Sequence, residues 1–142
     1  MNLTEHFTLE EMTATSHRQF DNTPNDVEIA NLRRTAELLE KVKPIVRNKP
    51  MVITSGYRSK QVNDSVGSKD TSQHRLGCAA DFQIPGYTPD EVVRAIIDAG
   101  LPFDQLIREF DSWTHMSVPS APGLLPRRQV LIIDKTGTRP FV

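Results

Sequence analysis

The chain has 142 residues, of which 37% are hydrophobic and 25% are charged, and its formal net charge is −1. This length and composition are typical of one globular domain with a single hydrophobic core, and they exclude wholesale disorder. The near-neutral charge excludes an overall attraction to nucleic acid or to an anionic membrane, and the single cysteine, Cys78, excludes an internal disulfide.

Helices are predicted for the first third of the chain. Thr8 and Glu11 form a capping box, which indicates a short helix near the N-terminus. After the turn NTPND (22–26), apolar residues recur at helical spacing with charges between them, so we predict a longer helix that Pro44 kinks or ends. Residues 51–54 then form a predicted strand that runs into the loop SGYRS.

Strands are predicted for most of the remaining chain. Residues 79–84 have the pattern of a buried strand, and Thr88 and Glu91 form a capping box that opens a helix ending at Gly100. Three β-rich segments follow, DQLIREF, WTHMSV and QVLIID. Because helices come first and most strands later, we predict a small α+β domain with a mainly antiparallel sheet and helices packed on it.

We treat residues 1–142 as one domain, with a motif core at about 50–118 and a final strand and tail at 119–142. The first twelve residues, MNLTEHFTLEEM, have neither the basic nor the apolar region of a signal peptide. Nowhere does an apolar run reach the about 20 residues that span a bilayer. We therefore expect a monomer made in the cytoplasm, with no membrane insertion and no nucleic-acid partner.

The stretch SQHRLGCAAD (72–81) contains two candidate metal ligands, His74 and Asp81. They are too far apart to share one helix face, but they converge if the chain turns at Gly77 and returns as a strand. Asp81 then lies in an otherwise apolar strand, where an unpaired carboxylate is costly. Binding a cation offsets that cost, which favours a metal site.

A third ligand is expected because catalytic zinc usually has three protein ligands and a water molecule. His6 and His17 lie among polar residues, where a solvated surface position is expected. In WTHMSV, strand alternation places His115 on the face opposite Met116 and Val118, so His115 faces a cleft if those two residues are in the core. The spacing alone leaves an ordinary structural histidine, in a metal-free domain, as an alternative.

The motif SQHRLGCAAD is followed by EFDSWTH (109–115) and preceded by ITSGYRS (53–59). In this combination the segments resemble the zinc D-alanyl-D-alanine carboxypeptidase-like peptidoglycan peptidases, whose relatives include phage L-alanyl-D-glutamate endolysins and D-Ala-D-Ala dipeptidases. FTLEEM, DNTP and FDQLIREF are similar to the compact phage and prophage branch of that family. The resemblance spans about residues 7–117 and implies a fold shared with the hedgehog signalling domain.

The resemblance implies a Zn²⁺ cofactor with three ligands: His74, Asp81 and His115. It also implies that Arg58 binds substrate and stabilises the oxyanion. Three further residues are expected to line the substrate cleft: Ser72, Gln73 and Trp113. Without the resemblance, the first two would be turn residues and the tryptophan could equally be a core residue.

Metal-assisted hydrolysis also needs a general base. In several relatives an acid lies three residues before the last histidine ligand, but this chain has Ser112 there. We expect Glu109 to be the base, as in the compact branch, with Asp111 as the reserve. If Asp111 and Ser112 form a tight turn, Glu109 lies across from Thr114 or His115.

The leading hypothesis is therefore a zinc metallopeptidase that hydrolyses peptidoglycan stem peptides or cross-links, as a carboxypeptidase or as an endolysin-like endopeptidase. The alternative is a non-catalytic, zinc-bearing domain that binds the cell wall or belongs to a virion. A protein made in the cytoplasm would reach the wall after release or as part of a virion.

Overall fold

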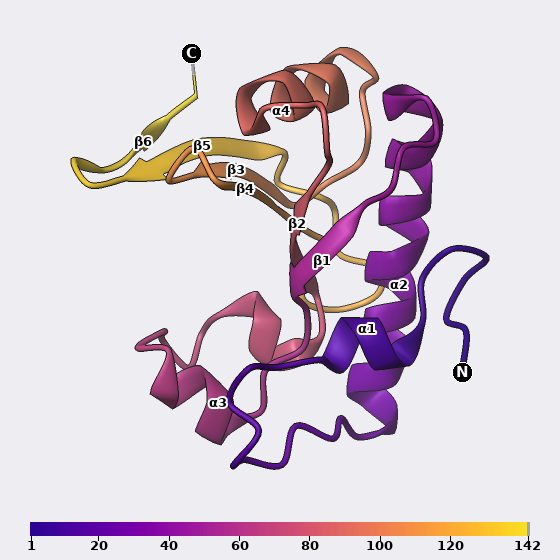
Figure 1. Ribbon diagram of the computed structural model, residues 1–142, viewed down its shortest axis with the longest axis vertical. Coiled ribbons are helices and arrows are strands. Elements are labelled where there is room, and N and C mark those ends of the chain that lie inside the picture. Colours follow the sequence, from indigo (N-terminus) through magenta and orange to yellow (C-terminus); the bar gives the residue numbers. More distant parts are fainter. Residues whose placement is uncertain (142) are drawn as a thin grey trace.

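The computed structural model describes residues 1–141 (Figure 1). Three helical elements come first: α1 (Leu9–Thr13), α2 (Asp26–Val42) and the 3₁₀ helix η1 (Lys43–Val46). Capping boxes open both α helices, as the Thr8–Glu11 pair predicted for α1. Pro44 lies in the first turn of η1, where α2 has just ended, because proline cannot donate the hydrogen bond that would continue the α-helix.

Six strands form one sheet in the order β1-β2-β4-β3-β5-β6. Their bounds are β1 (Val52–Ser55), β2 (Ala79–Gln83), β3 (Gln105–Glu109), β4 (Trp113–Ser117), β5 (Gln129–Asp134) and β6 (Gly137–Pro140). Neighbouring strands are antiparallel except β3 and β5, which are parallel. The predicted α+β fold with a mainly antiparallel sheet is confirmed, and part of the expected C-terminal tail forms a sixth strand.

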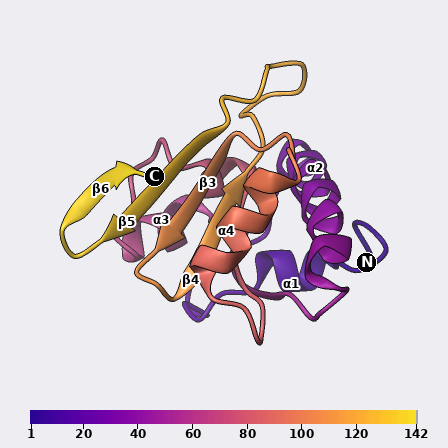
Figure 2. The ribbon, with the colours of Figure 1, turned by 90° about the horizontal axis from the view of Figure 1, so that it is seen from above.

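The core lies between the sheet and the helices α1, α2 and α4 (Pro89–Asp98). Figures 1 and 2 show α4 lying across β3 and β4, with α2 beside it on the same side of the sheet. The largest fully buried side chains come from all these elements and include Met12, Leu32, Leu39, Ile96, Leu106 and Met116. This packing leaves the opposite face of β4 and β3 available for a functional site.

Strand alternation separates the two faces of β4, as the sequence predicted. Met116 and Val118 are buried in the core, whereas His115 points to the other face. The free thiol of Cys78 is buried as well.

The short helix α3 (Lys60–Ser65) was not predicted, because it buries only Val62 and Asn63 and has no long apolar stripe. Its N-cap, Ser59, accepts a hydrogen bond from the Val62 amide and ends the loop SGYRS. Within residues 1–141, none of the helices combines the length and the apolar character needed to cross a membrane.

Candidate metal centre and active site

The turn at Gly77 brings the two halves of SQHRLGCAAD together. His74 lies on the 3₁₀ helix η2 (Gln73–Leu76), which ends at Gly77 with a left-handed φ of 79°, and the chain then returns as β2. A Cβ atom at position 77 would lie 2.6 Å from the carbonyl oxygen of Glu28, so glycine is required by space as well as by conformation. The predicted turn is confirmed, and it places Asp81 beside His74.

Three buried side chains meet at this point: His74, Asp81 and His115. Each offers a ligand atom, and these atoms all lie within 4.8 Å of one another. Asp81 Oδ1 lies 2.9 Å from His115 Nδ1 and 3.4 Å from His74 Nε2. The sheet contributes to this geometry, because Asp81 of β2 and His115 of β4 are directly paired.

The ring of His74 is fixed by a hydrogen bond from its Nδ1 to the carbonyl oxygen of Gly56, at 2.7 Å. A carbonyl can only accept, so Nδ1 carries the proton, and burial lowers the pKa of His74 and keeps the ring neutral. The unprotonated Nε2 then faces a carboxylate oxygen of Asp81, which is also an acceptor. Two facing acceptors suit a shared cation, and one carboxylate with two imidazoles is a ligand set found in catalytic zinc sites.

Asp81 is ionised despite its burial. Burial raises its pKa, but interactions with neighbouring groups, including the hydrogen bond with His115 Nδ1, outweigh this effect and hold the pKa of Asp81 well below its usual range. For His115, burial lowers the pKa, but the hydrogen bond to Asp81 and the negative charges of Asp81 and Glu109 together outweigh burial and raise it. Asp81 thus contributes a buried negative charge to the centre.

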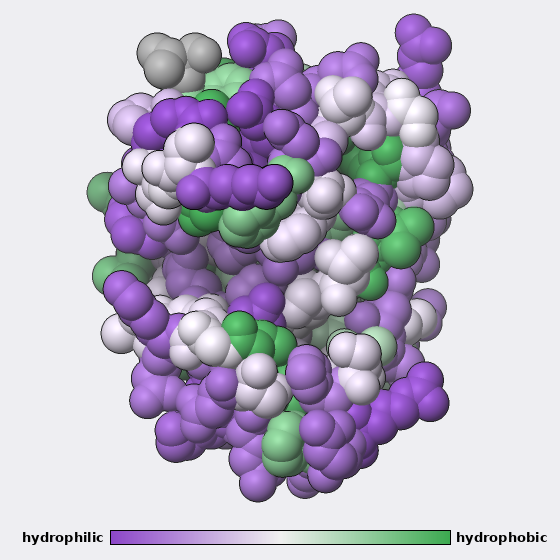
Figure 3. Space-filling view, turned by 60° about the vertical axis from the view of Figure 1, so that its left-hand side comes forward, coloured by the Kyte–Doolittle hydropathy of each residue, from purple (hydrophilic) through white to green (hydrophobic). Residues whose placement is uncertain are grey.

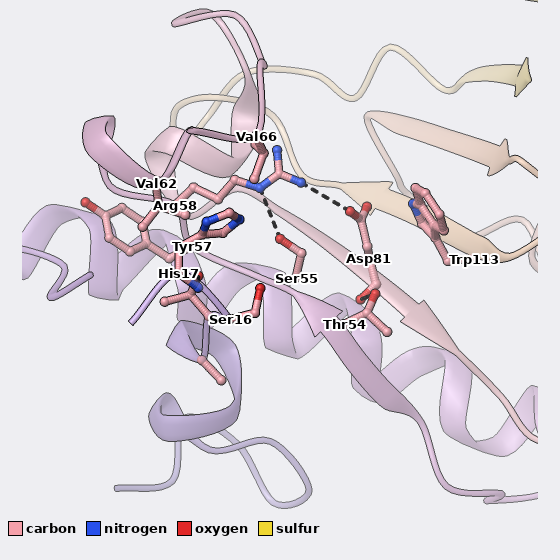
Figure 4. A pocket seen from close by; sticks show the side chains of 12 residues that line it. Ser16, His17, Thr54, Ser55, Tyr57, Arg58, Val62, Val66, Asp81 and Trp113 are labelled. Carbon is pink, nitrogen blue, oxygen red and sulfur yellow. Dashed lines mark hydrogen bonds and ion pairs between the residues drawn. The ribbon is translucent and has the colours of Figure 1, made fainter. Parts of the chain in front are cut away.

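Arg58 borders the cluster from the loop that follows β1. Its Nη2 lies 3.5 Å from Asp81 Oδ2, and its Nε donates a hydrogen bond of 3.1 Å to Ser55 Oγ (Figure 4). Its backbone amide donates to the carbonyl oxygen of His74 at 3.0 Å. The guanidinium group is thus held next to the candidate ligands.

Glu109 borders the cluster from the end of β3. Its Oε1 lies 3.8 Å from His115 Nδ1, and the side chain is largely buried. Burial raises the pKa of Glu109, and the negative charge of Asp81 raises it further. A carboxylate with a raised pKa beside a group of candidate metal ligands is suited to taking and returning a proton.

The hairpin between β3 and β4 differs by one residue from the expectation. Its central residues, with φ of 54° and 49°, are Phe110 and Asp111, and the Ser112 amide donates to the Glu109 carbonyl at 3.0 Å. Because β3 ends at Glu109 and β4 begins at Trp113, the connection has three residues, and Glu109 pairs with Trp113 rather than with Thr114 or His115. Its side chain still shares a face with His115, because Trp113 and His115 are two residues apart on one strand.

Asp111, the reserve candidate for the base, faces elsewhere. Its carboxylate lies 3.0 Å from Arg108 Nε, and its side chain is 74% exposed. Asp111 thus has an ordinary turn position.

A cleft of about 670 Å³ adjoins the cluster on the Glu109 side. A smaller pocket of about 280 Å³ lies on the side of the N-terminal segment and includes His17 (Figure 4). The two cavities share Arg58, Asp81 and Trp113. Seen from the side, the molecule has a recess between its upper and lower parts (Figure 3).

The three predicted substrate-lining residues all border the larger cleft. Ser72 caps η2 by accepting a hydrogen bond from the His74 amide, at 3.3 Å. The amide nitrogen of Gln73 is already engaged, since it donates to Asp104 Oδ2 and to the Val118 carbonyl oxygen, both at 3.0 Å. Trp113 packs on Phe110, with ring centroids 5.6 Å apart, and lines both cavities.

Other cleft residues were not identified from the sequence, and the C-terminal strand β5 supplies two of them, Leu131 and Ile133. The sequence QVLIID indicates a strand in which Leu131 and Ile133 alternate with Val130 and Ile132, but it does not indicate which strand β5 pairs with. Lys69 and His17 also line the cavities, and their polar sequence surroundings gave no signal of this position.

An α+β domain with a buried His-Asp-His cluster, a bordering carboxylate and a bordering arginine has the features of a metallopeptidase. Residues 5–117 match the family model described as Peptidase M15, and the chain belongs to this family. A comparison with curated proteins finds no significant match. The family is one of zinc peptidases that act on peptidoglycan, so the match confirms the family resemblance seen in the motifs.

Proposed function

We propose that this chain is a zinc-dependent peptidase that hydrolyses peptide bonds in peptidoglycan stem peptides or cross-links. His74, Asp81 and His115 would hold the zinc ion. The observation that carries the proposal is that Glu109 and Arg58 both border this cluster, on the walls of one cleft. A zinc site of purely structural or binding function needs neither a carboxylate with a raised pKa nor an adjacent guanidinium group.

A bound zinc ion acts as a Lewis acid, which polarises a carbonyl group and lowers the pKa of water to about 7. Glu109 would take a proton from the attacking water and return it to the departing amine, which requires one group to act first as base and then as acid. Arg58 would donate to the carbonyl oxygen as negative charge develops on it. The hydrogen bond to Ser55 keeps the guanidinium group in place for this role.

The shape of the cleft favours cleavage within a substrate peptide rather than removal of its terminal residue. A carboxypeptidase must recognise a terminal carboxylate, whereas an endopeptidase needs room for the peptide on both sides of the reacting carbonyl. Here cavities of about 670 and 280 Å³ lie on two sides of Arg58 and Asp81. We therefore assign an endolysin-like endopeptidase activity, exerted on the cell wall after release or from a virion.

The decisive experiment is mass spectrometry of the fragments released from defined muropeptides by the purified, zinc-loaded protein. Internal cleavage that stops with a chelator and with Glu109→Gln is the expected result. Release of a single terminal residue would replace the endopeptidase assignment with a carboxypeptidase. Zinc binding without any cleavage would support the non-catalytic alternative, and elemental analysis showing no metal would contradict both.

A further inference from the structure

The candidate metal centre and the C-terminal strand β5 share one face of the sheet. Strand register pairs Asp81 with His115, His115 with Ile107, and Ile107 with Leu131. These residues therefore form one row across β2, β4, β3 and β5. The neighbouring row runs from Trp113 through Glu109 to Ile133.

Three apolar side chains thus lie directly beside Glu109: Ile107, Leu131 and Ile133. We call them the apolar shelf. All three line the cleft of about 670 Å³. The core does not account for the two on β5, because the alternate residues Val130 and Ile132 of that strand are the ones that face the core side.

The shelf is held firmly by contacts at the start of β5. The Asp104 carboxylate accepts hydrogen bonds from the backbone amide and guanidinium group of Arg127, at 2.7 to 3.0 Å. The Gln129 amide donates to the Asp104 carbonyl oxygen at 3.0 Å, next to the parallel pairing of β5 with β3 (Figure 2). A wall positioned by such contacts is suited to selecting a ligand by shape.

Two of the three shelf residues, Leu131 and Ile133, lie in the C-terminal part of the chain, whereas Ile107 lies on β3 within the family match. The family match ends at Ser117, so Leu131 and Ile133 lie outside it, whereas the candidate ligands and Glu109 lie within it. The segment that follows the matched region thus adds one apolar wall to the cleft beside Glu109.

We infer that the apolar shelf is a specificity subsite, which binds the hydrocarbon part of a substrate side chain next to the scissile bond. The inference rests on the proposed peptidase function. The occupant is the substrate because the shelf is continuous with the row that holds His115 and lies beside Glu109. Its three side chains offer no charge or hydrogen bond, so they select for methylene and methyl groups.

The test uses peptides based on a cleaved stem peptide, in which the residues on either side of the scissile bond are varied separately among glycine, alanine and norleucine. In one of the two series kcat/KM should rise by up to about fourfold for each methylene that the shelf covers. Leu131→Ser and Ile133→Ser should flatten this rise, and Leu131→Met should retain it. Leu125→Ser is the matched control, because Leu125 belongs to the same C-terminal segment, is 88% exposed and does not line the cleft.

The inference would be overturned if kcat/KM still rose with side-chain length in both serine variants. It would also be overturned if the serine variants lowered kcat/KM equally for the glycine, alanine and norleucine peptides of a series. A doubling of molecular mass that depends on Leu131 would overturn it too, since a second copy of the chain would then cover the shelf.

A binding measurement separates failure of the shelf from failure of the peptidase function. Trp113 is the single tryptophan of the chain and lines the cleft, so its fluorescence reports occupancy. In zinc-loaded Glu109→Gln, the norleucine peptide of the responsive series should bind more tightly than the glycine peptide, and Leu131→Ser added to this variant should remove the difference. One outcome is that the wild type cleaves none of the peptides while norleucine at either position still tightens binding in a way that Leu131→Ser removes. In that case the peptidase function fails and the shelf stands. If cleavage occurs without the pattern, the shelf fails.

Discussion

His74 Nδ1 donates a hydrogen bond to the carbonyl oxygen of Gly56, and the same histidine accepts one at its own carbonyl from the Arg58 amide. The loop that carries the arginine and the helix that carries the first candidate ligand therefore position each other. Gly56 is essential to this contact, because a Cβ atom there would lie 2.2 Å from the carbonyl oxygen of Met12. The arginine loop SGYRS and the cluster of candidate metal ligands thus form one structural unit.

Removal of a candidate ligand should abolish both zinc binding and hydrolysis. We expect His115→Ala to lower activity by about 1,000-fold or more, because a bound metal supplies several kcal/mol of transition-state stabilisation. Zinc content measured by elemental analysis should fall in parallel. His6→Ala is the control, since His6 pairs with Glu40 away from the cluster and its replacement should leave zinc content unchanged.

Zinc should also stabilise the fold. The ion would neutralise the buried negative charge of Asp81, and a ligand at 100 times its Kd adds about 2.7 kcal/mol to the free energy of unfolding. For a domain of this size we expect a rise in Tm of roughly 10 °C on adding Zn²⁺ to the metal-free protein. Differential scanning calorimetry measures this shift, and an unchanged Tm in wild type would contradict zinc binding at a buried site.

Glu109→Gln should separate chemistry from metal binding. Glutamine has nearly the same size but cannot take up a proton, so kcat should fall by about 100-fold or more while zinc content stays at the wild-type level. Asp111→Asn should retain most of the activity, because Asp111 pairs with Arg108 and is exposed to solvent. The reverse result, with only the Asp111 variant inactive, would assign the base to Asp111.

His74 and Asp81 could be proposed as ligands from sequence because their determinants are local, whereas His115, 34 residues after Asp81, was assigned as the third ligand through the family resemblance. A glycine between a histidine and an aspartate indicated the turn, a carboxylate in an apolar strand indicated a bound cation, and alternation assigned the face of His115. The β5 wall of the cleft could not be predicted, since its position depends on parallel pairing of β5 with β3, in which partners such as Gln105 and Gln129 are 24 positions apart in the chain. Glu109 was predicted to lie across from Thr114 or His115 but pairs with Trp113. The difference arises because the left-handed residues are Phe110 and Asp111, so the turn begins one residue earlier than predicted.

Gly77→Ala should be markedly destabilising. The left-handed conformation costs about 1–2 kcal/mol for a residue with a Cβ atom, and here that atom would also lie 2.6 Å from the Glu28 carbonyl oxygen. Gly67→Ala is a matched control, because Gly67 has a similar φ of 74° with no atom within 4 Å of the added Cβ. Chemical denaturation should show a loss at Gly77 that exceeds the loss at Gly67, and equal losses would mean that the contact with Glu28 is relieved at little cost.

The hydrogen bonds between Asp104 and Arg127, which attach the C-terminal segment to the rest of the fold, predict that part of the free energy of unfolding is lost in acid. Burial raises the pKa of Asp104, but hydrogen bonds from Arg127 and Gln73 outweigh it and lower the pKa below its usual value. A lowered pKa means that the stabilisation is fully present above the ordinary aspartate value of about 3.9 and is lost as the pH falls through the lower, folded-state value. Urea unfolding of wild type and Asp104→Asn should therefore show a stability difference at pH 7 that shrinks below about pH 4. A difference that stays constant down to pH 2 would show that packing, rather than the charge of Asp104, holds the segment.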